Sequence, residues 1–369
     1  MTPLLDRLKS ESFLVPTVGF LLFLAVYLII FSFGGNKYYS VERMLTQWDA
    51  QHYLSIAERG YEMFPCSYGD GYICGNIGWF PFYPLLAALI ALVIPATNWV
   101  MLIISWLSFY FALLLIYKLA SDRYGEKAAL MSVLTVLVFP ASFYYLSAFP
   151  YALYLLLALL VYYLIDKKRN GLIILPSFLL GITYPSGSLI ILPLIYFMIK
   201  NRESLNSTEK NKFIGAIIAP AVALILYGLY YQIAFGDFFL YLKFQSQSYY
   251  SHQMNFPLLV IYDSLRNLEL SDPVNISLIF ITVGMLLFYN KKLPVAFQIF
   301  MGAILLFTPT MGTTVCYYRH IVIAFPLYIM LGMAIESNWK KYLLPLYLIT
   351  AVILNWLIFI PAYQHGSLM

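Results

Sequence analysis

Long apolar segments separated by short polar clusters dominate the chain. The first of them, residues 13–33, follows Arg7 and Lys9 and is long enough to cross a bilayer, which takes about 20 helical residues. It has no small-residue cleavage site, so we expect a retained helix rather than a signal peptide. The same criterion predicts an all-α polytopic membrane protein with eleven spans: 13–33, 99–119, 128–147, 150–165, 171–184, 186–199, 213–235, 273–289, 294–309, 320–335 and 342–360.

Basic residues set the predicted orientation, because cytoplasmic loops are enriched in Lys and Arg. With the amino terminus inside and the carboxyl terminus outside, the cytoplasmic loops hold 16 of the 22 Lys and Arg residues. Counting the short segment Trp79–Pro95 as another span would reverse this distribution. We therefore expect a re-entrant or interfacial helix there, with an aromatic belt at its start. The predicted cytoplasmic loops are 1–12, 118–127, 166–170, 200–212, 290–292 and 336–341.

The stretch from Gly171 to Lys200 is too short for two full spans, although both of its flanks are basic. Thirty helical residues extend only about 45 Å. Two short helices broken at residues 183–187 fit better. Irregular backbone at membrane depth must be buried in protein or face a water-filled cavity. The break therefore lines such a cavity, or else it forms an ordinary tight hairpin near the outer surface.

Composition supports a membrane protein: 62% of the residues are hydrophobic and only 11% are charged, far below the quarter or so typical of soluble domains. This excludes a disordered chain, a nucleic-acid binder and a secreted disulfide scaffold. We expect one transmembrane domain over residues 1–369 with two long external loops, about 34–98 and 236–272. A transporter would carry ionisable groups within its spans. In this chain the ionisable groups instead concentrate in the predicted external segments. These segments hold nine of the 17 acidic residues and all four histidines: His52, His252, His320 and His365.

The first external loop contains a candidate acid–base pair. Read as a helix, Gln47–Tyr61 places Asp49, His52 and Tyr53 on one side, and Gly60 is positioned to end it in a left-handed cap. A carboxylate one turn from an imidazole, beside Trp48, suits proton transfer from an attacking hydroxyl. The alternative is an interfacial amphipathic helix in which Asp49 caps a turn and His52 is merely solvated.

Cysteines and metal-binding patterns add one further expectation. Cys66 and Cys74 lie eight residues apart in the first external loop, where oxidation is permitted, so we predict a disulfide, with two free thiols as the alternative. Cys316 is expected to be unpaired. The sequence has no metal-ligand motif and no nucleotide fingerprint, so we predict neither a metal nor another cofactor.

Two strings resemble the GPI mannosyltransferase II (PIG-V) family and its prokaryotic relatives. These are W-D-x-x-H-Y-L-x-I-A-x-x-G-Y at 48–61, which is highly specific, and W-F-P-F-Y-P-L-L at 79–86. Less specific segments follow in the family's order over most of the chain: 139–151, Gly236-Asp237 with Gln245, and 318–326.

The resemblance implies a GT-C fold and an inverting glycosyltransferase at the non-cytoplasmic face of the cell membrane. Its substrates would be a polyprenyl-phosphate sugar, with mannose the expected sugar, and a lipid-linked or surface glycan acceptor. Asp49 matches the family's base. We expect Arg319 and His320 to bind the donor phosphate, since guanidinium matches phosphate oxygens; the alternative for Arg319 is an interface anchor. The expected pocket residues are Trp48, His52, Tyr184 and His252.

The sequence departs from the family pattern at two positions. Leu153 stands where relatives often carry Glu, and Tyr184 stands where they often carry Arg. One hypothesis is that the two residues form an ion pair in relatives, because losing both charges is tolerable whereas losing one is not. The departures leave a catalytically inactive GT-C-like subunit open as a rival. A second rival is a flippase or transporter of lipids or lipid-linked sugars, whose central cavity could use the break at Tyr184-Pro185.

Overall fold

Helices make up most of the structure, a computed structural model that describes residues 10–34, 40–66, 72–247, 252–267, 272–337 and 340–365. The strands in this part of the chain form one antiparallel hairpin, β1 (Met63–Pro65) with β2 (Ile73–Gly75), in which Phe64 is opposite Cys74. The first half contains α2 (Glu11–Gly34), α3 (Val41–Leu45), α4 (Asp49–Arg59), α5 (Phe82–Ala91), α6 (Thr97–Tyr124), α7 (Glu126–Val138), η1 (Ser142–Tyr145), α8 (Tyr151–Asp166), η2 (Asn170–Ile173) and α9 (Ile174–Gly181).

The second half continues the helical architecture, and it ends near the carboxyl terminus with a π-helical segment, η5, between two α-helices. Its elements are η3 (Pro185–Ile190), α10 (Ile191–Lys200), α11 (Ser207–Phe235), α12 (Leu240–Gln245), α13 (Pro257–Arg266), α14 (Asp272–Tyr289), α15 (Val295–Thr310), α16 (Tyr317–His320), η4 (Ile321–Ile323), α17 (Phe325–Glu336), α18 (Lys340–Ile353), η5 (Leu354–Phe359) and α19 (Ile360–His365).

Within the described ranges, four helical segments are long and apolar enough to span a membrane: 11–32, 97–124, 207–235 and 341–358. A fifth arises if the pair formed by 317–323 and 325–336, bent by 84°, counts as one span. Six further apolar helices have 10–17 residues. The chain therefore has the helices of a membrane protein, whereas the count of eleven spans and their orientation stay predictions.

Two predicted spans differ from the helices observed. The span 128–147 ends at Val138, because Pro140 follows and Ala141 adopts a left-handed conformation with φ of 68°. The Ala141 amide, which this break removes from the helix, donates to the side-chain oxygen of the buried Asn355 at 2.9 Å. The span 320–335 is bent instead of straight: α17 restarts at Phe325 with Pro326 in its first turn, where a missing N–H is tolerated.

The predicted break after α9 is present and buried. Thr183 and Ser186 are fully buried, and the Tyr154 hydroxyl donates to the Ser186 carbonyl at 3.1 Å. Gly187 is required here because a Cβ would lie 1.8 Å from the Leu180 carbonyl oxygen. The irregular backbone between α9 and α10 is thus enclosed by protein.

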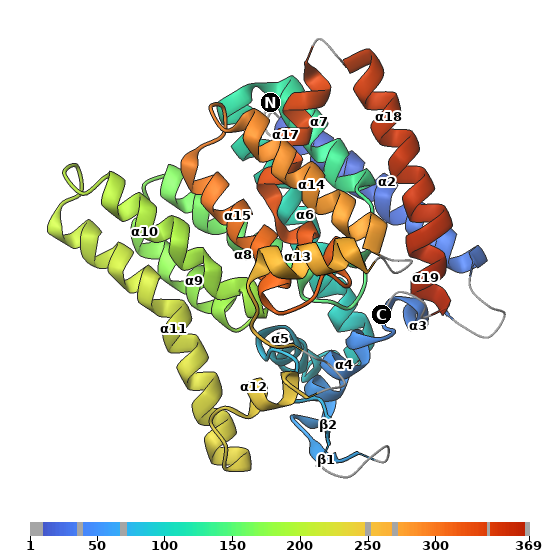
Figure 1. Cartoon of the computed structure of the whole chain (residues 1–369), viewed down its shortest axis with the longest axis vertical. Helices are drawn as coiled ribbons and strands as arrows, with labels where there is room; N and C mark the ends of the chain where they lie inside the picture. Colours follow the sequence, from blue (N-terminus) through green and yellow to red (C-terminus); the bar gives the residue numbers. More distant parts are fainter. Residues whose placement is uncertain are drawn as a thin grey trace.

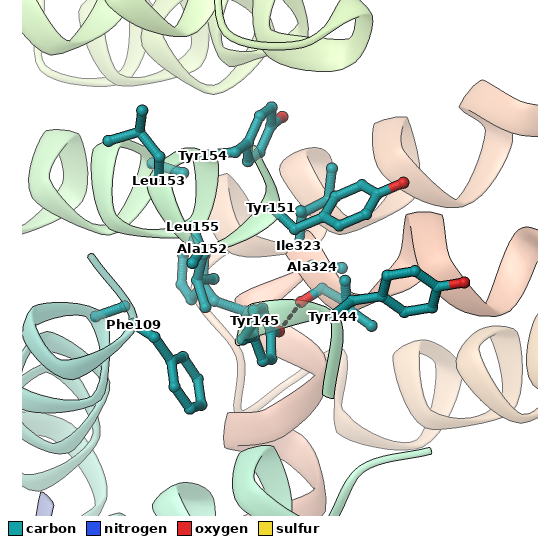
Figure 2. Packing of buried hydrophobic residues seen from close by; sticks show 14 of the residues in the cluster. Phe109, Tyr144, Tyr145, Tyr151, Ala152, Leu153, Tyr154, Leu155, Ile323 and Ala324 are labelled. Atoms are coloured by element: carbon teal, nitrogen blue, oxygen red, sulfur yellow. Dashed lines mark hydrogen bonds between the residues drawn. The ribbon is translucent and has the colours of Figure 1, made fainter. Parts of the chain in front are cut away.

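The elements of the two long loops that were predicted to be external gather at one end of the molecule. Figure 1 shows α4, α5, α12 and the β1–β2 hairpin together at the bottom, while α9, α10 and α11 lie to one side and α2 and α18 to the other. Above them the core is aromatic. Figure 2 shows Tyr145 beside Phe109, with which it stacks at 4.4 Å between ring centroids, while its hydroxyl donates to the Val322 carbonyl. This packing fixes η1 and η4 against α6.

Candidate active site

An ion pair between residues 270 positions apart forms the centre of the candidate site. Arg319 Nη1 donates to Asp49 Oδ2 at 2.9 Å. The two side chains are 17% and 28% exposed, so the pair is largely buried but still reached by solvent. The Arg319 Nε atom is buried and has no hydrogen-bond partner in the described part of the chain. A guanidinium with one N–H unsatisfied can bind a further anion.

The backbone on both sides of this pair is strained. Asp49 begins α4, and Trp48 before it has φ of +60°; Arg319 lies in α16, which is preceded by Cys316 with φ of +57°. Non-glycine residues seldom adopt such angles, and they concentrate where the surrounding structure holds a functional geometry. Trp48 is held in place by its indole N–H, which donates to the Tyr363 carbonyl at 2.6 Å.

The helix around Asp49 differs in detail from the sequence prediction. It spans Asp49–Arg59 and not 47–61. Gly60 does end it with φ of +80°, but ψ is −167°, so the cap is extended and not the left-handed cap expected. Asp49 caps no turn through its side chain, because its carboxylate is paired with Arg319.

His320 and Tyr184 meet beside the ion pair. The Tyr184 hydroxyl and His320 Nδ1 are 2.7 Å apart, which joins the break after α9 to α16. The Tyr184 ring packs edge-on against Tyr151 and Tyr154 of α8. Leu153 is buried on a different side of that helix, and Figure 2 shows it directed away from Tyr151. These contacts argue against an ion pair between positions 153 and 184.

His52 faces an aromatic surface. Its ring stacks on Trp79 with 3.5 Å between centroids and 13° between planes. Burial lowers the pKa of the His52 imidazole, and the Asp49 carboxylate opposes that effect. The neutral form of His52 is therefore favoured, and its ring forms part of the wall of the site without carrying a charge.

Two glutamines connect the two long predicted loops. Gln245 donates to the Gly78 carbonyl at 3.0 Å, and its amide oxygen lies 2.7 Å from His252 Nδ1. Gln247 both accepts from the Ile73 amide at 2.6 Å and donates to the Ile73 carbonyl at 3.1 Å. His252 lies close enough to Arg319 and Asp49 for both charges to act on it; burial and Arg319 lower its pKa. His252 of the second loop thus lies within electrostatic range of the ion pair.

The cysteines predicted as a pair are disulfide-bonded: Cys66 and Cys74 close the β1–β2 hairpin, with 5.0 Å between their Cα atoms. Cys316 takes no part in that bond and is buried near Arg319. Among the described residues there is no group of three or more His, Cys, Asp and Glu side chains able to hold a metal ion. His365 ends α19, and its side chain lies outside the described part.

Sequence reasoning missed several residues of the site. Tyr144 and Tyr151 both lie within electrostatic range of Arg319, and Figure 2 shows their hydroxyls directed to the same side. Gln247 was also not singled out. Both tyrosines stand in the segment 139–151 that resembles the family, but tyrosines are common throughout this chain and nothing there marks these two hydroxyls as part of the site. Gln247 follows α12, which ends at Gln245, and no sequence signal predicts its contact with Ile73.

The fold of this chain is similar to that of a solved oligosaccharyltransferase. The particular solved structure that carries the comparison is the Archaeoglobus fulgidus oligosaccharyltransferase tethered with an acceptor peptide containing the NVT sequon. It matches with a TM-score of 0.50 and 12% identity over 98% of this chain and 56% of that one. The complex of the same enzyme with Zn and sulfate matches with a TM-score of 0.46 and 13% identity, over 96% of this chain and 53% of that one. Its apo form matches with a TM-score of 0.47 and 12% identity, over 97% of this chain and 56% of that one.

This chain thus spans little more than half the length of those oligosaccharyltransferase chains. At 12% identity the likeness establishes the fold alone. No protein-family model matches the sequence, and no curated protein matches it. The resemblance to the PIG-V family therefore stays a prediction, and function must be argued from the site.

Proposed function

We propose that the chain is an inverting glycosyltransferase of the cell membrane that moves a sugar, in the first instance mannose, from a polyprenyl-phosphate donor to a lipid-linked or surface glycan acceptor. The observation that carries this proposal is the Asp49–Arg319 pair, since it brings a carboxylate and a phosphate-binding guanidinium into one partly exposed site. The GT-C fold supports the reaction class.

In the proposed reaction, the acceptor hydroxyl oxygen attacks the anomeric carbon on the face opposite the phosphate. The bond from that carbon to the phosphate oxygen breaks, and its electron pair leaves with the polyprenyl phosphate. Asp49 Oδ accepts the hydroxyl proton. The result is one new glycosidic bond with an inverted anomeric centre.

Arg319 is suited to the leaving group because only part of its fork is used. Nη1 binds Asp49, and the unsatisfied Nε–H is left to bind a phosphate oxygen. Such a contact strengthens as negative charge grows on the leaving phosphate, which is how positioned donors lower a barrier. The same contact ties the base to the donor, because Arg319 touches both.

His320 adds a second donor in this scheme. With the Tyr184 hydroxyl donating to Nδ1, the imidazole is neutral and carries its proton on Nε2, which can donate to the phosphate. Tyr184 then positions His320, a role that Arg at this position would not fill in the same way. Trp48 and His52 shape the wall nearest Asp49, and His252 belongs to the loop that covers the site.

The rival flippase or transporter and the inactive subunit find less support. For the transporter, the charged pair lies at the start of α4 and in the short helix α16, and not in the middle of one of the four long apolar helices of the described ranges. In an inactive subunit, nothing would preserve a partly exposed ion pair flanked by strained backbone.

Purified full-length protein, supplied with membrane lipid extract, should transfer radiolabelled mannose from polyprenyl-phosphate mannose and none from nucleotide-linked mannose. A glycosylated, chain-extended product is the expected readout. Parallel proteoliposomes report whether the lipid donor crosses the bilayer. Translocation without any glycosidic product would overturn the proposal in favour of a flippase, and donor binding with neither event would favour an inactive subunit.

A further inference from the structure

An apolar groove lies between α8 and the η2–α9 segment, outside the candidate active site. Its volume is about 680 Å³, and its lining is almost entirely apolar: Leu160, Leu164, Leu172, Leu175 and Phe178 are among its residues. Leu172 and Leu175 are 55% and 64% exposed, so the groove opens to the surroundings. From Gly171 to Phe178 it follows α9 for roughly 10 Å, the scale of the upper part of an acyl chain.

A basic pocket adjoins this groove at its Gly171 end. It is lined by Tyr163, Leu164, Lys167 and Arg169, and Leu164 belongs to both hollows. On the other side, the Lys212 side chain from α11 lies over Gly171, with Nζ 3.9 Å from the position of a Cβ there. Basic side chains thus flank the point at which the apolar groove begins.

Two of these cations, Arg169 and Lys212, are not neutralised by the described part of the protein. Lys167 reaches Asp122 at 3.4 Å, and Asp166 is paired with Arg123. In contrast, Lys168, Arg169 and Lys212 form no ion pair within the described ranges. Lys168 also adopts φ of +54°, in the turn that follows α8.

We propose that this composite site binds an anionic membrane phospholipid, with its phosphate between Arg169 and Lys212 and one acyl chain in the apolar groove. An anionic headgroup joined to an apolar chain matches a basic pocket joined to an apolar groove, as a neutral lipid does not. The positive-inside prediction places residues 166–170 and 200–212 on the cytoplasmic side, and the leaflet there is the anionic one.

Native mass spectrometry of the purified full-length protein tests this site without any transfer assay. The probes are phosphatidylglycerol and phosphatidylcholine with identical acyl chains. Wild type should retain phosphatidylglycerol at least tenfold more than phosphatidylcholine. Arg169→Gln/Lys212→Gln should lose that preference. The matched control, Lys291→Gln/Lys292→Gln, removes the same charge from the turn between α14 and α15 and should keep it.

A third variant tests the groove itself: Leu175→Gln keeps every cation and should still lower phosphatidylglycerol retention severalfold. Thermal unfolding of each variant checks folding, and the single changes Arg169→Gln and Lys212→Gln replace the double change if it unfolds. Equal retention of the two lipids by wild type, as for ordinary surrounding lipid, would overturn the proposal. So would an unchanged preference in the double variant, or displacement of the lipid by glycerol phosphate, which would indicate a headgroup-only anion site.

Discussion

At the scale of residues, Arg319 combines a charge with a planar fork that Lys cannot reproduce. Arg319→Lys should therefore keep measurable transfer while raising the KM for the lipid donor about tenfold. Arg319→Gln removes the charge and should lower kcat/KM by about 10²–10³, the range for losing one donor that stabilises developing charge. Steady-state kinetics with polyprenyl-phosphate mannose measure both. Equal kinetics in wild type and Arg319→Gln would mean that Arg319 is only an interface anchor.

His52 gives a prediction about pH. Burial lowers the pKa of His52 in the folded protein below its ordinary value of about 6.5. As pH falls through 6.5, the unfolded chain takes up a proton that the folded chain does not, so stability is lost towards acid. Thermal unfolding from pH 7.5 to 5.5 should show a falling Tm. His52→Gln should show a smaller fall, and parallel curves for the two proteins would contradict this account.

The sequence identified both partners of the central pair but not their contact. Asp49 stands in a specific motif, and Arg319 was selected for its chemistry, so each was predicted separately. Nothing local predicts that residues 270 positions apart come within 2.9 Å, because that contact depends on how α4 and α16 pack. The partner of Tyr184 was missed for the same reason: the family comparison suggested only that positions 153 and 184 pair in relatives, whereas in this fold Tyr184 contacts His320.

At the scale of elements, contacts with the β1–β2 hairpin and with α12 hold the part of the second loop that carries His252. Gln247 forms two hydrogen bonds with the Ile73 backbone, next to the disulfide-bonded Cys74. Gln245, two residues earlier, is hydrogen-bonded to His252. Gln247→Ala should release this loop and raise the KM for the donor severalfold with little change in kcat. Gln253→Ala, an exposed change six residues on, serves as the control. If both variants had wild-type KM, the contact would have no part in donor binding.

Most helices followed from apolar length alone, and the exceptions have local causes. The break at 183–187 was predicted because two spans did not fit between two basic flanks. The end of α7 at Val138 was not, since hydropathy continues through Pro140 while the backbone does not. The bend between η4 and α17 was also missed, although Pro326 marks it.

At the scale of the whole molecule, membrane orientation is the main untested prediction. In a cysteine-free background, single cysteines at Phe64 in β1 and Lys292 after α14 should react from opposite sides of the membrane. An impermeant maleimide added to intact cells should label position 64 only, and lysis should expose position 292. Labelling of both positions from outside would contradict the charge-based topology.

The fold and the chemistry rest on different grounds. Sharing a fold at 12% identity fixes how helices are arranged over 98% of the chain, but not which sugar or acceptor is used. The claim that decides the account is that Asp49 removes the acceptor proton while Arg319 holds the donor.

Single-turnover transfer with the donor already bound tests that claim most directly, comparing Asp49→Asn with wild type and with Asp237→Asn, a partly exposed carboxylate paired with Lys243. Asp49→Asn should bind polyprenyl-phosphate mannose about as well as wild type and transfer it about 10²–10⁴ times more slowly, the range for a lost general base. Asp237→Asn should behave as wild type. Transfer at the wild-type rate by Asp49→Asn would contradict the account.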